Sequence, residues 1–136
     1  MEIVARVCSS PTTHEVTVGS DGASRPFPVP GKTGGGGSAL NGGEFLMLAL
    51  ATCYCNDLYR EARRLGIPID VVEVTATAEF PGIGLAATNI RYHATVRTSA
   101  PAAGIARLLS ETDAVAEVHN TLRAGVAVTM AWQLPE

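Results

Sequence analysis

The sequence predicts an α+β domain in which one long buried helix lies on antiparallel sheet. Residues 45–58 form an almost unbroken apolar segment with helix signals at both ends, and residues 70–80 and 88–98 alternate strictly between apolar and polar side chains. Such alternation is typical of strands with one buried face, and a short connector between two of them favours a hairpin. The predicted order is β-β-loop-α-β-β-α-β, within a single domain that covers residues 1–136.

The N-terminal third is expected to hold two short strands, at 2–8 and 14–18, separated by a turn rich in Ser, Pro and Thr. Residues 20–24 have turn chemistry as well. Residues 25–43 contain three prolines and seven glycines, which predicts a long irregular connection. A structureless segment of this length in a small domain usually has a function or covers a neighbour.

The long helix is expected to begin near Asn41, a good N-cap, with Glu44 placed to complete a capping box. Gly66 and Pro68 end it after Leu65. Its first half is apolar on every face, which predicts burial all round.

The C-terminal part is predicted to form a second helical region and a last strand. The helical region follows residue 100, with an interruption near 110–113 and an end at Gly125. Alternation of apolar side chains then predicts a strand over 126–134.

The composition excludes several classes of protein. The net charge is −3 and the ten Lys and Arg residues are scattered, so no nucleic-acid partner is expected. The longest apolar run, 45–55, is too short to span a bilayer, and three cysteines without an export signal suggest reduced thiols. We therefore expect a cytoplasmic protein with no membrane partner. Because 46 % of the residues are apolar, burial against another subunit is expected too.

Cys53 is the residue on which an enzymatic interpretation depends. A helical cysteine is reactive when a cation, a helix N-terminus or a hydrogen bond stabilises its thiolate, whereas a thiol buried without such help is inert core filler. The pattern alone favours filler, because free cysteine is among the most buried residue types. Cys55 points about 200° away around a helix, so the two cannot form a disulfide without local unwinding.

No metal or cofactor is expected. The neighbouring cysteines have no third or fourth ligand at a suitable spacing, and His14, His93 and His119 lie in separate elements. Residues 31–33, Gly-Lys-Thr, lack the first glycine of a phosphate-binding loop, because Pro26 stands at that position.

Glu44 has two interpretations. It caps the helix, or its carboxylate orients an arginine near a thiol. Arg25 and Arg6 could each serve as that cation, and no sequence argument separates them.

Residues 42–53, followed by 65–67 and the strand 70–80, resemble the OsmC/Ohr family of osmotically inducible and organic-hydroperoxide-resistance proteins. Members typically have a (Ser/Asn)-Pro-x-Glu-Leu-Leu segment that opens a long central helix and leads to a cysteine. The resemblance extends from about residue 14 to 134. It implies an intertwined homodimer, in which the two long helices are buried at the centre.

The active members of this family are thiol peroxidases. Their first cysteine attacks an organic hydroperoxide and becomes a sulfenic acid, and a second cysteine on the later helix then forms a disulfide that dithiols reduce. Cys53 matches the first cysteine. Glu44 matches the family glutamate that holds an arginine over the thiolate, and Arg25 is the candidate for that arginine.

The chain departs from this pattern at the second cysteine. That residue is expected at Val115 or Ala116, and neither is a cysteine. The residue before Glu44 is Gly43, where proline is usual within one or two positions. A sulfenic acid at Cys53 therefore needs an external thiol, or Cys55 after distortion of the helix.

Three functional hypotheses follow. The first is thiol-dependent reduction of small apolar hydroperoxides at Cys53, or a degenerate form of it, with an external thiol as reductant. The alternative is a non-catalytic dimer that binds a small apolar ligand at the subunit interface. The third is a structural dimer in which both thiols are core residues.

Overall fold

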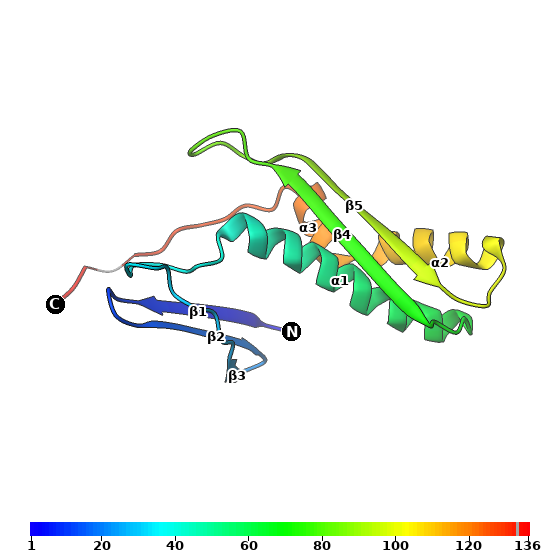
Figure 1. Ribbon diagram of the computed structural model, residues 1–136, viewed down its shortest axis with the longest axis horizontal. Helices are drawn as coiled ribbons and strands as arrows, with labels where there is room; N and C mark the ends of the chain where they lie inside the picture. The colour runs from blue at the N-terminus through cyan, green and yellow to red at the C-terminus, as the bar shows by residue number, and fades with distance from the viewer. Residues whose placement is uncertain (133) are drawn as a thin grey trace. The chain divides into compact units, whose positions relative to one another are not determined.

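The structure is a computed structural model that describes residues 1–132 and 134–136. In chain order its elements are β1 Ile3–Ser9, β2 His14–Ser20, β3 Ala23–Pro26, α1 Gly42–Leu65, β4 Val71–Glu79, β5 Thr88–Arg97, α2 Ala102–Val115 and α3 Glu117–Ala124 (Figure 1). The contacts divide the chain into two compact units, Met1–Phe45 and Leu46–Glu136. Both sheets are antiparallel, so the predicted α+β class is confirmed, whereas the single-domain organisation stays a prediction.

The first unit is built on a three-stranded sheet in the order β1-β2-β3. Its first two strands lie where the sequence predicts them, and Val7 faces Val16 across the pair. The third strand was not predicted. Asp21 and Gly22 both have positive φ, 50° and 81°, which is typical of a tight two-residue hairpin turn, so the chain returns at once to pair with β2.

The second unit contains the two-stranded sheet β4-β5, which the alternating patterns predicted. Val74 faces Ala94 and Thr75 faces His93, and the register shifts between Thr77 and Glu79. Successive residues of β4 alternate between exposed and partly buried along the whole strand. One face of this sheet therefore packs inward, as the period of two requires.

Helix α1 begins and ends as predicted. The backbone N–H of Glu44 donates to Asn41 Oδ1 at 2.8 Å, and the backbone N–H of Asn41 donates to Glu44 Oε2 at 2.8 Å. These two bonds are the reciprocal pair of a capping box. At the other end Gly66 has φ 69°, the left-handed conformation that closes a helix, and the Ile67 N–H donates to Ala62 O at 2.9 Å.

The core of the second unit forms along one stripe of α1. Tyr54, Leu58 and Ala62 are buried there, and Leu108 of α2 is buried with them. Apolar side chains of the inward sheet face pack against this cluster, among them Val72, Val74, Tyr92, Ala94 and Val96. The expected burial on every face is not found within one chain, because Leu48 is 51 % exposed.

Two predictions for the C-terminal part are wrong. The helical region is interrupted at Ala116 and not near 110–113. The Thr112 hydroxyl instead donates to Leu108 O at 2.7 Å and stays buried within the helix. Residues 126–132 form no strand, and residue 133 lies outside the described residues. Val128 and Met130 are 99 % and 80 % exposed, and residues 126–132 pair with no strand in the described part of the chain.

Within the described residues, no helix has both the length and the apolar character needed to cross a membrane.

Candidate functional site

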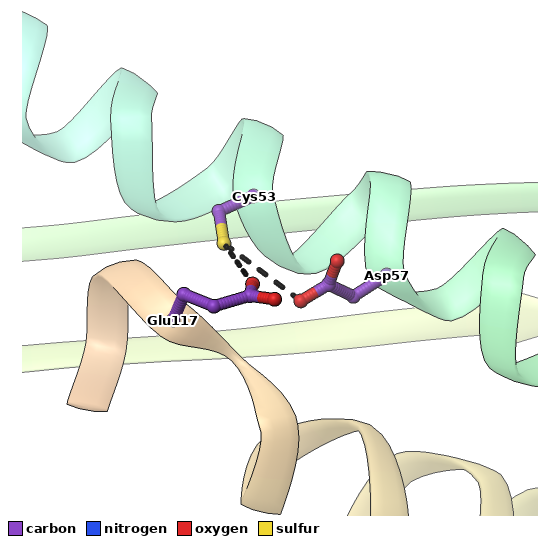
Figure 2. Close-up of side chains that lie close together, drawn as sticks. All are labelled: Cys53, Asp57 and Glu117. Atoms are coloured by element: carbon purple, nitrogen blue, oxygen red, sulfur yellow. Dashed lines mark hydrogen bonds between the residues drawn. The ribbon is translucent and has the colours of Figure 1, made fainter. Parts of the chain in front are cut away.

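Cys53 lies beside two carboxylates in the second unit (Figure 2). Its Sγ is 3.8 Å from Asp57 Oδ2 and 4.0 Å from Glu117 Oε2. One ligand atom from each of the three residues lies within 4.8 Å of the others. We call Cys53, Asp57 and Glu117 the thiol–carboxylate cluster.

The local structure explains why these groups meet. Asp57 follows Cys53 by four residues, and residues at that spacing are neighbours on a helix surface. Glu117 is the first residue of α3, where a carboxylate is favoured by the helix dipole. Ala116, at the interruption between α2 and α3, is fully buried in the core. It thereby fixes the start of α3 against α1.

Arg60 binds the outer oxygens of both carboxylates. Its Nη1 lies 2.8 Å from Asp57 Oδ1 and 3.9 Å from Glu117 Oε1. The oxygens that face Cys53 are the other two, Oδ2 and Oε2. The guanidinium thus orients the carboxylates from one side and leaves one oxygen of each toward the sulfur.

The environment favours the neutral thiol. Burial is the largest cause that raises the pKa of Cys53, and the carboxylates of Asp57 and Glu117 raise it further, while the backbone N–H of Val118 acts in the opposite direction. Burial also raises the pKa of Asp57 and Glu117 adds to this, although Arg60 opposes it. Among the residues that the structure describes, the acidic groups of the cluster therefore outnumber the one guanidinium that faces them.

The predicted site residues lie in different units. Glu44 caps α1, so the capping interpretation is confirmed. Arg25 lies on β3 opposite Val18, and Arg6 lies on β1 opposite Thr17. All three belong to the first unit and Cys53 to the second, so the pairing of Arg25 with Cys53 stays a prediction.

Sequence reasoning missed Asp57, Glu117 and Arg60 as members of the site. The first could have been found, because a carboxylate four residues after a helical cysteine shares its face. Arg60 follows Asp57 by three residues, a spacing that also brings two side chains together on a helix. Glu117 gave no signal, since its approach depends on where α2 is interrupted. Cys55 is half-buried and Cys8 exposed, and both are free thiols.

A buried histidine lies on the other side of α3, since residues two apart on a helix point about 200° away from each other. His119 is 3 % exposed, and neither of its ring nitrogens has a hydrogen-bond partner among the described residues. Its ring packs against Tyr92 and Tyr54, with centroids 4.3 Å and 5.8 Å away. A cavity of about 210 Å³ next to it is lined by Leu50, Ile90, Tyr92, His119, Leu122 and Arg123. Burial lowers the pKa of His119, so its ring is neutral at neutral pH.

Comparison with known proteins decides the family. The model of the family described as OsmC-like protein matches residues 35–131. The chain belongs to the OsmC-like family. Among curated proteins, none matches the chain.

Solved OsmC-like structures share this fold. The OsmC-like protein from Mycoplasma pneumoniae has a TM-score of 0.63 at 18 % identity, with 90 % of this chain and 89 % of that chain covered. The organic hydroperoxide resistance protein OsmC from Legionella pneumophila has a TM-score of 0.59 at 17 % identity, with 90 % of each chain covered. An OsmC-like hydroperoxide resistance protein from Jannaschia sp. CCS1 has a TM-score of 0.54 at 16 % identity, with coverage of 98 % and 91 %.

The family match contains the whole thiol–carboxylate cluster. The positions at which the resemblance implies a second cysteine, Val115 and Ala116, directly precede Glu117. In this OsmC-like chain, the side chain from that region that reaches Cys53 is therefore a carboxylate.

Proposed function

We propose that this OsmC-like protein reduces organic hydroperoxides, with Cys53 as the nucleophile and a thiol from solution as the reductant. One observation carries the proposal. The Cys53 thiol lies 3.8 Å from an oxygen of Asp57, a buried carboxylate that can accept its proton. An adjacent base is one of the ways in which proteins activate a nucleophile.

The first step consumes one hydroperoxide and produces one alcohol. Asp57 takes the thiol proton, and the thiolate attacks the terminal oxygen of the hydroperoxide. The S–O bond forms as the O–O bond breaks, and the leaving alkoxide takes the proton from Asp57. The Val118 N–H, which lowers the pKa of Cys53, stabilises the thiolate before it attacks. The raised pKa of Asp57 suits a group that must hold a proton and then release it.

The second step needs a thiol from outside the chain. No cysteine lies between residues 113 and 122, so the sulfenic acid condenses with an external thiol to give a mixed disulfide and water. A second external thiol attacks that disulfide, releases the oxidised reductant and restores the Cys53 thiol.

Intact-mass spectrometry after mixing with cumene hydroperoxide tests the proposal. Wild-type protein and Cys55→Ser should each gain one oxygen faster than free cysteine reacts, and Cys53→Ser should not. Asp57→Asn should slow the gain. With excess thiol, wild type should turn over many equivalents of peroxide. Oxidation of Cys53 no faster than that of free cysteine would contradict the proposal.

A second candidate function is non-catalytic binding of a small apolar molecule, and the cavity lined by Leu50, Ile90 and Leu122 favours it. Saturable binding of an apolar ligand together with slow oxidation of Cys53 would select this function over the first.

We also propose that two copies of the chain form a homodimer. Support comes from the exposed alternating segment 126–132, in which Trp132 is 71 % exposed, and from the exposed Leu48 of α1. Apolar surface of this extent is typical of a face that a partner covers, and a second copy offers sheet edges to which the segment can pair. Light scattering should give twice the mass of one chain, and Val128→Glu should shift the mass toward that of one chain. A wild-type monomer at micromolar concentration would contradict this.

A further inference from the structure

We propose that the thiol–carboxylate cluster binds a divalent cation of the zinc class, with Cys53 Sγ, Asp57 Oδ2 and Glu117 Oε2 as ligands. The inference goes beyond hydroperoxide reduction and does not depend on it. It begins from the convergence of three ligand atoms, from two helices, within 4.8 Å of one another.

The distances suit tetrahedral coordination. Zinc binds thiolate sulfur at about 2.3 Å and carboxylate oxygen at about 2.0–2.2 Å, which places neighbouring S and O ligands about 3.5 Å apart. The two S···O distances are 3.8 Å and 4.0 Å, so each needs to shorten by only a few tenths of an ångström. The Glu117 side chain is 71 % exposed and is free to make this movement.

Arg60 holds the two carboxylates in an orientation that suits coordination. It binds Oδ1 of Asp57 at 2.8 Å and faces Oε1 of Glu117 at 3.9 Å. Partners outside the ligand shell fix carboxylate ligands in just this way, by holding the oxygen that does not bind the metal. Both remaining oxygens are directed toward the same sulfur (Figure 2).

A divalent cation would lower the excess negative charge of the cluster. A thiolate and two carboxylates carry three negative charges, and the guanidinium of Arg60 that faces them also contacts Glu61 at 3.3 Å. A cation of charge +2 offsets most of this charge, and its binding would displace the proton of the Cys53 thiol. In the absence of a metal, burial and the two carboxylates keep that proton on the sulfur.

The ligand types select the metal. Thiolate sulfur prefers Zn²⁺ or its softer analogue Cd²⁺, while Mg²⁺ and Ca²⁺ prefer sites made only of oxygen. Three protein ligands leave a fourth position for water or for a thiol from solution. The expectation of no metal considered only spacing along the chain, whereas Glu117 comes from a distant helix.

Titration with Cd²⁺ alone tests the proposal, because a Cd²⁺–thiolate bond absorbs in the ultraviolet and the readout needs no peroxide. Every protein carries Cys8→Ser, since that exposed thiol could bind the probe. We expect one Cd²⁺ per chain in this parent, the same in a Cys55→Ser variant, and no band in a Cys53→Ser variant. Zn²⁺ should displace Cd²⁺, and excess Mg²⁺ or Ca²⁺ should not.

The variant Glu117→Gln distinguishes a three-ligand metal site from binding of the metal by the Cys53 thiol alone. Its side chain lies on the surface, so the fold should persist, and the loss of one ligand should weaken Cd²⁺ binding about tenfold or more. Glu73→Gln, on the exposed face of β4, is the matched control and should bind as the parent does. Unchanged affinity in Glu117→Gln, or an unchanged band in Cys53→Ser, would overturn the assignment. Neither result would contradict the proposed hydroperoxide reduction, which the mass-spectrometric oxidation assay tests separately.

Discussion

The substitution Glu117→Gln should make Cys53 more reactive, because it removes a negative charge beside the sulfur without changing the shape of the side chain. Two unit charges 4 Å apart interact by about 1 kcal/mol in water and about 4 kcal/mol at an effective dielectric constant of 20. Glu117 Oε2 lies 4.0 Å from Cys53 Sγ. Because most of the Glu117 side chain is exposed, the lower value applies. About 1 kcal/mol corresponds to about a fivefold increase in the thiolate fraction at neutral pH.

The assay is the rate of alkylation of Cys53 by iodoacetamide as a function of pH, in a background of Cys8→Ser and Cys55→Ser. The pKa of Cys53 is raised, so alkylation of the parent should accelerate as the pH rises toward that pKa. Glu117→Gln should move the profile toward lower pH, and the difference should shrink at high salt, which screens exposed charges. Glu73→Gln should leave the profile in place. A Glu117→Gln rate equal to or below that of the parent at pH 7 would refute the electrostatic reasoning.

Two further predictions concern His119 and Glu44. His119→Phe should raise the free energy of unfolding by about 1–3 kcal/mol, because it removes a buried imidazole that has no hydrogen-bond partner among the described residues. Urea denaturation measures this change, with the exposed His93→Phe as the control. A lower free energy of unfolding in His119→Phe would contradict the prediction. Glu44→Gln should keep the capping box, which accepts Gln as well as Glu, and so keep the stability while it slows peroxide reduction. An unchanged rate would leave Glu44 with the capping role alone.

Local signals predicted the elements that local physics specifies. Asn41, Glu44 and Gly66 marked both ends of α1, because capping bonds and a left-handed closing residue act within one turn of chain. The alternation of β4 and β5 likewise gave the buried face of their sheet. These features need no knowledge of distant residues, which is why one sequence was enough to find them.

Features that depend on distant partners were not predicted correctly. The segment 126–132 alternates as a strand does, but a strand exists only where another strand binds its backbone, and none of the residues that the structure describes does so. The interruption of the second helical region was expected at polar residues that favour caps, yet the Thr112 hydroxyl donates a hydrogen bond to Leu108 O within the helix. Because the helical region is interrupted at Ala116, Glu117 begins α3 next to Cys53. The wrong position predicted for the interruption therefore also hid the contact between Glu117 and Cys53.

The chemistry of Cys53 therefore depends on what neutralises two carboxylates. With Arg60 alone, burial and the carboxylates favour the protonated sulfur, so attack on a peroxide requires that Asp57 first accept the proton. A second guanidinium, such as the predicted Arg25, would favour the thiolate and the peroxide reaction. A divalent cation would also produce the thiolate but would withdraw electron density from the sulfur and make it a weaker nucleophile. Hydroperoxide reduction and metal binding are thus competing ways to remove the same surplus of negative charge, and Cd²⁺ should slow the oxidation of Cys53 in proportion to its occupancy.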